Sequence, residues 1–154
     1  MFQTRLFLFL LLLVVISLPQ NAFAQLDDIT ITEETELDFG RLLADKRSSI
    51  VTVQTNGSVN TTQTTIYVGG ASVAQFRITG EPDTNFILSF SEGDFLNGPG
   101  QAIEIGDWQH NGGSNLFFNG AGQRNINVGG RMYLNANQLA GIYTGTYTIT
   151  VNYQ

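Results

Sequence analysis

The strongest pattern in the chain is an unbroken alternation from Tyr143 to Tyr153. Aromatic residues, β-branched apolar residues and a glycine occupy one set of alternate positions, and threonine or asparagine occupies the other. A period of two is typical of a strand with one buried face. We therefore expect a terminal strand that closes an all-β fold, with these residues on its inner face: Tyr143, Gly145, Tyr147, Ile149, Val151 and Tyr153.

Shorter alternating runs occupy much of the preceding sequence. Clusters of glycine, asparagine, proline and aspartate separate them, and these residues favour turns. The spacing predicts about eight short strands, which is typical of a β-sandwich or barrel. The runs cover residues 29–39, 50–55, 64–68, 74–79, 86–90, 103–108, 126–134 and 143–153.

The glycine-rich stretch Asn97–Gly122 is the least regular part of the pattern. It contains Gly98-Pro99-Gly100 and two further Asn-Gly sequences. We expect long loops there around one or two strands, and long loops often carry binding residues.

The first 24 residues have the pattern of a secretory signal peptide. Arg5 precedes an apolar run from Leu6 to Ile16, and Ala22-Phe23-Ala24 supplies small residues for cleavage. The alternative is an uncleaved anchor, but the run is shorter than the ~20 residues that span a bilayer. Cleavage would leave one domain, residues 25–154, with no membrane span and an exported location in the periplasm, at the cell surface or outside the cell.

Charge and cysteine content narrow the function further. Residues 25–154 hold six basic residues against 13 acidic ones, a net charge of −7. A chain without a basic patch is a poor ligand for nucleic acid or anionic lipid. The chain has no cysteine, so burial and strand pairing must stabilise it. Six acidic residues near the start predict a solvated strand face or, alternatively, a cation-binding run: Asp27, Asp28, Glu33, Glu34, Glu36 and Asp38.

Four short sequence segments together resemble a bacterial secreted family known as domain of unknown function 4402. They are Leu37-Asp-Phe-Gly40, Phe76-Arg-Ile-Thr-Gly80, Asn127-Val-Gly-Gly-Arg-Met132 and Ala140–Tyr153. That family is similar to the spore coat protein U domain and to subunits of archaic chaperone–usher pili. The resemblance implies an immunoglobulin-like β-sandwich, exported by a Gram-negative bacterium, with a surface, fimbrial or adhesive role.

The same resemblance implies partners. Pilin-like subunits end in a strand whose penultimate aromatic residue, here Tyr153, is read by a periplasmic chaperone. A polymerising pilin also completes its neighbour by β-strand addition from an N-terminal extension. Only Gln25–Asp28 precede the first alternating run. Either Ile29–Thr32 is itself the donor, or the sandwich is self-complete.

Candidate catalytic groups are few, and we expect no enzyme activity and no cofactor. His110 is the single histidine, and Asp107 and Ser114 lie near it in sequence, but a catalytic triad is defined by geometry. Two carboxylate pairs, Glu92 with Asp94 and Glu104 with Asp107, suit solvated positions as well as glycoside hydrolysis. With one histidine and no cysteine, a zinc site would need several carboxylates. A calcium site near Asp94 or Asp107 is an alternative, since loop oxygens are its usual ligands, although the spacing does not match an EF-hand loop.

Two functions therefore remain. The first is a non-enzymatic, fimbria-like structural or adhesion module that pairs sheet edges with like subunits or a chaperone, through Ile29, Ile31, Tyr147, Ile149, Val151 and Tyr153. The alternative is a carbohydrate-binding sandwich that uses the Asn97–Gly122 loops, with an exposed Trp108 as an aromatic platform beside His110, Asn111 and Asn115. The competing interpretation places Trp108 in the core, and at least one of Phe117 and Phe118 should also face inward.

Overall fold

The protein is an all-β sandwich, seen here in a computed structural model that describes residues 25–154. This range contains twelve strands and no helix, so it holds no helix that could cross a membrane. The predicted signal peptide, residues 1–24, lies outside the described residues. The strands are β1 (Thr30–Thr35), β2 (Arg41–Leu43), β3 (Ser49–Val53), β4 (Val59–Thr61), β5 (Ile66–Gly69), β6 (Ala74–Thr79), β7 (Asn85–Phe90), β8 (Asp94–Leu96), β9 (Ile103–His110), β10 (Leu116–Phe117), β11 (Gln123–Leu134) and β12 (Ile149–Tyr153).

The expected number of strands, about eight, was too low. The additional strands β2, β4, β8 and β10 each have only two or three residues. Such short runs are too brief to show an alternation in sequence, and neighbouring strands define them instead. The glycine-rich stretch does contain two strands among its loops, β9 and β10, as expected.

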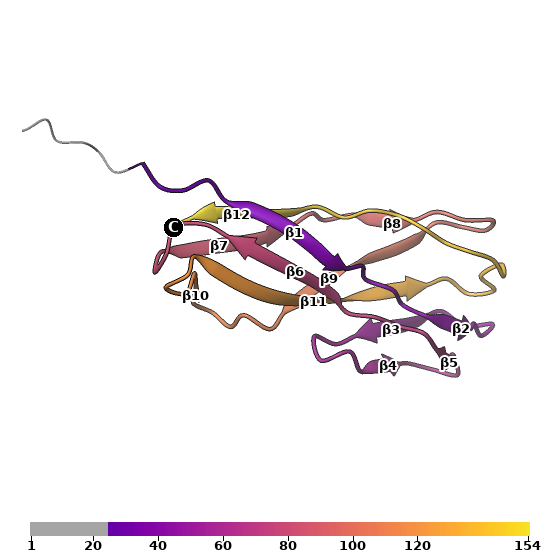
Figure 1. Ribbon diagram of the computed structural model, residues 1–154. Helices are drawn as coiled ribbons and strands as arrows, with labels where there is room; N and C mark the ends of the chain where they lie inside the picture. The colour runs from indigo at the N-terminus through magenta and orange to yellow at the C-terminus, as the bar shows by residue number, and fades with distance from the viewer. Residues whose placement is uncertain (1–24) are drawn as a thin grey trace, which may run out of the picture.

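The larger sheet is built around β11, the long strand that crosses the body of the molecule in Figure 1. All of its pairings are antiparallel, and its strand order is β1-β6-β11-β3-β4. The first half of β11 pairs with β6 and the second half with β3. Strand β9 pairs with β11 over Val128–Tyr133, and β8 pairs with β9.

The inward face of β11 shows why the strand can run this far. Residues 126, 128, 130, 132 and 134 are all buried, which is the period of two that a strand requires. The Gly129-Gly130 pair lies inside the strand because both positions are crowded. A Cβ on Gly129 would overlap the carbonyl oxygen of Val53, and one on Gly130 would lie 2.7 Å from the ring of Trp108.

A β-bulge in β9 explains the position of Trp108. The register between β11 and β9 shifts between Gly129 and Arg131, and Asp107 adopts a left-handed backbone with φ of 46°. The extra residue in β9 changes its alternation, because a bulge offsets one strand against its partner. Ile103 and Ile105 face inward before the bulge, and Trp108 packs against the core after it.

A smaller sheet, β10-β7-β12, covers one end of the larger sheet, and β2 pairs with β5 at the other end (Figure 1). The core accordingly has two clusters of buried side chains. The first cluster lies between the sheets: Ala74, Phe76, Ile78, Phe86, Leu116, Phe118, Ile126 and Val128. The second cluster lies at the β2–β5 end: Phe39, Val51, Val53, Ile103, Ile105, Met132 and Leu134.

The expected first and last strands are each shorter than the alternation suggested. Strand β1 ends at Thr35, and residues 36–40 make only an isolated bridge between Asp38 and Ser72. Regular pairing at the other end begins at Ile149, and residues 143–148 make an isolated bridge between Asn97 and Thr144. The alternation of burial nevertheless continues through residues 36–39. In residues 143–148, Tyr143 and Tyr147 are half-buried as predicted, but Gly145, predicted on the inner face, is exposed. These two incompletely paired segments lie on either side of the candidate site.

Candidate functional site: a groove between two unpaired edges

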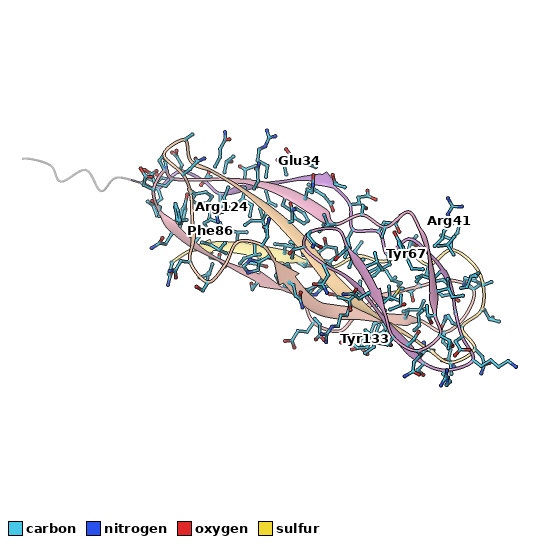
Figure 2. The ribbon with its side chains drawn as sticks, turned by 90° about the horizontal axis from the view of Figure 1, so that it is seen from below. Glu34, Arg41, Tyr67, Phe86, Arg124 and Tyr133 are labelled. Atoms are coloured by element: carbon cyan, nitrogen blue, oxygen red, sulfur yellow. The ribbon has the colours of Figure 1, made fainter. Side chains whose placement is uncertain are left out.

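A groove of about 960 Å³ opens at the β2–β5 end of the sandwich. One wall is the segment Glu36–Ala44, and the other is the segment Gln138–Thr144 with Gly145 and Tyr147. The base is apolar and consists mainly of residues of the second cluster: Leu96, Ile103, Ile105, Met132 and Leu134. Arg41 and Tyr67 lie at this end of the molecule, and Phe86 and Arg124 lie at the other (Figure 2).

The first wall offers free backbone groups to the groove. Asp38 exchanges two hydrogen bonds with Ser72, at 3.0 and 2.9 Å, and the Ser72 hydroxyl donates to the carbonyl oxygen of Glu36. Backbone groups of an extended chain point alternately to its two sides, so those of Leu37 and Phe39 point the other way. Within residues 25–154, neither Leu37 nor Phe39 makes a backbone hydrogen bond.

The second wall has the same arrangement. Thr144 exchanges hydrogen bonds of 3.0 and 2.7 Å with Asn97, and the carbonyl oxygen of Thr148 accepts from Ser91. The backbone groups of Gly145 and Tyr147 form no hydrogen bond with any other residue of the described part of the chain. Their alternate positions direct them to the opposite side, which is the side of the groove.

The two walls run in opposite directions, since the chain passes from β1 to β2 one way and approaches β12 the other way (Figure 1). The mouth of the groove already exposes large apolar side chains, of which Ile142 is the extreme at 83% exposed. The groove therefore combines two edges that have unpaired backbone groups with an apolar base.

Tyr143 fixes the start of the second wall. Its hydroxyl donates to the carbonyl oxygen of Leu139 at 2.8 Å and accepts from the Gly100 N–H at 3.0 Å and from Gln138 Nε2 at 2.9 Å. A tyrosine that bonds back to the backbone a few residues upstream is a recurrent corner in immunoglobulin-like sandwiches, at the start of the strand named F. The corner supports the expected immunoglobulin-like fold.

The family comparison agrees with this architecture. Residues 29–153 match the family described as "Domain of unknown function (DUF4402)". The chain belongs to this family. No curated protein and no solved structure matches it. The family match confirms the resemblance found in the sequence for this DUF4402 member, whereas the wider resemblance to spore coat protein U and pilus subunits stays a prediction.

The six predicted strand-pairing residues of this DUF4402 member occupy different environments. Ile29, Ile149 and Val151 pack against the first cluster, and Ile31 is 38% exposed on β1. Strands β1 and β12 already pair with β6 and β7, each along one edge. Of the six residues, only Tyr147 lines the groove.

Tyr153 joins the two ends of the DUF4402 domain. Its hydroxyl accepts from the Glu81 N–H at 2.7 Å and donates to the carbonyl oxygen of Asp27. Its ring meets the edge of Phe118 at a centroid distance of 6.0 Å. The predicted chaperone-recognition residue is therefore also a packing residue of the folded domain.

Tyr147 carries an unpaired polar group at the groove. Its ring stacks on Trp108 with centroids 4.3 Å apart, and its buried hydroxyl has no hydrogen-bond partner in residues 25–154. Burial, with a smaller contribution from the nearby Glu33 carboxylate, raises the pKa of Tyr147 far above its usual value. The ring of Tyr147 therefore contributes stability through packing, and its hydroxyl does not.

A matched pair of substitutions tests these two tyrosines. Tyr143→Phe removes one hydrogen-bond donor and acceptor that three groups use, so we expect a loss of about 1–3 kcal/mol in the free energy of unfolding. Tyr147→Phe removes only an unsatisfied hydroxyl, so stability should stay the same or rise by about 1 kcal/mol. Urea denaturation of the two variants gives the comparison. Equal losses would show that the Tyr147 hydroxyl has a partner.

The residues of the carbohydrate alternative do not form an exposed platform. Trp108 packs between Tyr147 and Phe90, and its Nε1 donates to the carbonyl oxygen of Ser91 at 3.1 Å. His110 is half-buried, and its Nδ1 accepts from the Gly112 N–H, while burial lowers its pKa. Asn111 is exposed but its side chain accepts from the Asn127 N–H, and Asn115 is exposed. The interpretation of Trp108 as a core residue is the correct one.

The paired phenylalanines also behave as expected. Phe118 is fully buried and stacks on Phe86 with centroids 4.5 Å apart. Phe117 points outward, 46% exposed, with the Arg124 guanidinium 5.4 Å from its ring centre. An exposed pair that could form a contact patch is therefore absent at this position of the described chain.

The groups considered for catalysis have other partners. Asp107 accepts from Arg131 at 2.8 Å and from the Tyr133 hydroxyl at 2.6 Å, and these bonds, that of Tyr133 first, hold the pKa of Asp107 below its usual value. Asp94 accepts from the Ser91 hydroxyl, and Glu104 is exposed on β9. In residues 25–154 no three His, Asp or Glu side chains are grouped to hold a metal ion.

Sequence reasoning missed most of the groove. Gly145 is central to the second wall because a Cβ there would overlap the carbonyl oxygen of Phe95, yet the sequence marks it only as one step of an alternation. The first wall carried a signal in the phrase Leu37-Asp-Phe-Gly40, where apolar and acidic residues alternate beyond the end of β1.

Proposed function

We propose that the protein is an exported, non-enzymatic, fimbria-like structural or adhesion module that binds an extended segment of another polypeptide by β-strand addition in the groove. The observation that carries this proposal is the pair of facing edges with unpaired backbone groups above an apolar base. In β-strand addition, main-chain hydrogen bonds supply affinity and the pockets for alternate side chains supply specificity.

The energetics favour an occupied groove. A strand edge with unpaired N–H and C=O groups is a template for pairing with another chain. An added strand would pair with Leu37 and Phe39 on one side and with Gly145 and Tyr147 on the other. It would also cover exposed apolar side chains at the mouth, including Leu43, Val68, Leu139 and Ile142.

The sequence supports export and a non-catalytic role. Residues 1–24 have the pattern of a secretory signal, and a composition rich in threonine and asparagine suits a secreted β protein. The histidine and aspartate that were considered for chemistry form hydrogen bonds that stabilise β9 and its neighbours.

Hydrogen exchange on the folded protein tests the proposal directly. The probe is a synthetic peptide that alternates valine with threonine, added to the chain expressed for export. We expect the amide protons of Gly145 and Tyr147 to exchange quickly in the free protein and to become protected when the peptide binds. The Thr144 amide, which already donates to Asn97, should be protected in both states and is the internal control.

A second peptide with proline at its central positions controls for non-specific adhesion, because proline has no N–H to donate to a ladder. Protection of Gly145 and Tyr147 by the first peptide but not the second supports strand addition. If neither amide gains protection at saturating peptide, or if both peptides give the same protection, the proposal is wrong.

A further inference from the structure

We propose that the natural occupant of the groove is a segment of a different protein, with apolar residues at alternate positions and lysine or arginine between them where it passes Glu36 and Asp38. This inference rests on the proposed function, since it specifies the partner of the same groove. It follows from the charges along the two walls and not from the apolar base, which would accept many alternating segments.

The first wall presents its carboxylates on the outer side. Leu37 is half-buried and Phe39 is buried, whereas Glu36 and Asp38 are exposed. A strand added beside this wall would place its apolar side chains next to Leu37 and Phe39. Its remaining side chains would lie on the outer face beside Glu36 and Asp38, where opposite charges stabilise a cross-strand pair and like charges destabilise it.

Nearby residues leave these carboxylates unneutralised within the described chain. Glu34, shown in Figure 2, has an ion pair with Arg77, but no ion pair joins Glu36 or Asp38 to a basic group in residues 25–154. Burial and the proximity of Glu36 both raise the pKa of Glu33, which shows that negative charge is crowded here. The Asp38 carboxylate accepts a hydrogen bond from the Gly40 N–H at 2.7 Å and from no basic side chain in this part of the chain.

The second wall adds no charge that would offset the carboxylates of the first wall. Its groove-lining residues, from Gln138 to Tyr147, include no ionisable acid or base other than tyrosine, and Thr144 is exposed. The basic residue among the lining residues is Arg41, which lies beyond Gly40 and points away from the sandwich in Figure 2. A basic side chain is therefore favoured near Glu36 and Asp38, and a neutral one near Arg41.

The same charges argue against a second copy of this chain as the donor. The first alternating segment, Ile29–Thr35, offers two isoleucines followed by Glu33 and Glu34. In the groove of another molecule these carboxylates would approach Glu36 and Asp38, which like-charge repulsion opposes. In its own molecule the segment already pairs with β6 from Thr30 to Thr35.

The inference is tested by measuring the binding of four peptides to the chain expressed for export. Three share the alternating valine–threonine frame and differ at two central outward positions, which are lysine, glutamate or unchanged threonine. The fourth has the sequence of residues 25–36. From the usual strength of cross-strand charge pairs, we expect the lysine peptide to bind about five- to thirtyfold more tightly than the glutamate peptide, less so at high salt.

A pair of double variants identifies the groups responsible. Glu36→Gln with Asp38→Asn removes both carboxylates while Asn keeps an oxygen for the Gly40 N–H, so the preference for lysine should fall to near one. Glu92→Gln with Glu104→Gln removes the same amount of charge from exposed positions that do not line the groove, so the preference should be unchanged.

The outcomes separate the two proposals. Binding of all three frame peptides with equal affinity keeps strand addition and overturns the inferred charge of the partner. Tightest binding by the residue 25–36 peptide overturns it in favour of a second copy. If no frame peptide binds and Gly145 and Tyr147 stay unprotected, the proposed function itself is wrong, and this inference with it.

Discussion

Replacing Gly129 with alanine should prevent the chain from accumulating as a folded protein. Gly129 lies inside β11 where the strand passes β3, and an added Cβ would overlap the carbonyl oxygen of Val53 and lie 3.0 Å from the carbonyl carbon of Gln54. Backbone atoms of a paired strand cannot move away as a flexible side chain can. The methyl group would therefore separate β11 from the end of β3, where both strands contribute to the second cluster.

The expected cost is several kcal/mol, because overpacking of a rigid core costs about 1–3 kcal/mol and lost strand pairing adds to it. A domain of this size has a total stability of about 5–15 kcal/mol. We expect a large fall in soluble yield and, for any protein recovered, a lower urea midpoint.

Gly106→Ala is the matched control. Gly106 lies on β9, next to Arg131 of β11 in the register, and a Cβ there would meet no atom within 4 Å. The same substitution on a neighbouring strand should leave yield and midpoint close to those of the parent. If Gly129→Ala were as well tolerated as Gly106→Ala, the close approach of β11 to Val53 would be wrong.

The alternation of residues was sufficient to predict most of the sandwich. It identified β6 at its observed bounds and located β3, β7 and the two halves of β11 with their inward residues. These strands lie in the middle of sheets, where one face is buried and both edges are paired. Burial and backbone pairing coincide in these strands, so the alternation of apolar and polar residues, which reflects burial, also locates the strand.

The same alternation did not predict the groove, where side chains are buried but one backbone edge is unpaired. Leu37, Phe39, Tyr143 and Tyr147 are more buried than their neighbours, yet one edge of each of the two segments has no partner. Hydrophobic periodicity carries no information about edges, so the groove could not be predicted from it. The bulge at Asp107 was likewise hidden, because its effect is to reverse the alternation for Trp108.

Replacing Ile149 with aspartate should also prevent folding, and this variant tests the terminal strand that both the fold and the proposed function require. Ile149 is half-buried, packs against the first cluster and pairs with Phe90 of β7. Truncating a fully buried isoleucine costs about 2–5 kcal/mol and a half-buried one less, but an unpaired carboxylate facing an apolar cluster adds to that cost. We expect little folded protein after export and degradation of the remainder.

Thr150→Asp is the matched control, because it adds the same charge to β12 on its outward face. Thr150 is the next residue on β12, pairs with Ser89 and is exposed, so an aspartate there stays in water. We expect yield and urea midpoint to stay near those of the parent, within about 0.5 kcal/mol. Because β12 continues directly from the second wall, losing its inward face would also release Gly145 and Tyr147 from the groove. If Ile149→Asp left yield and stability unchanged, β12 would not be anchored through its inward face, and the groove would lack the fixed second wall that strand addition needs.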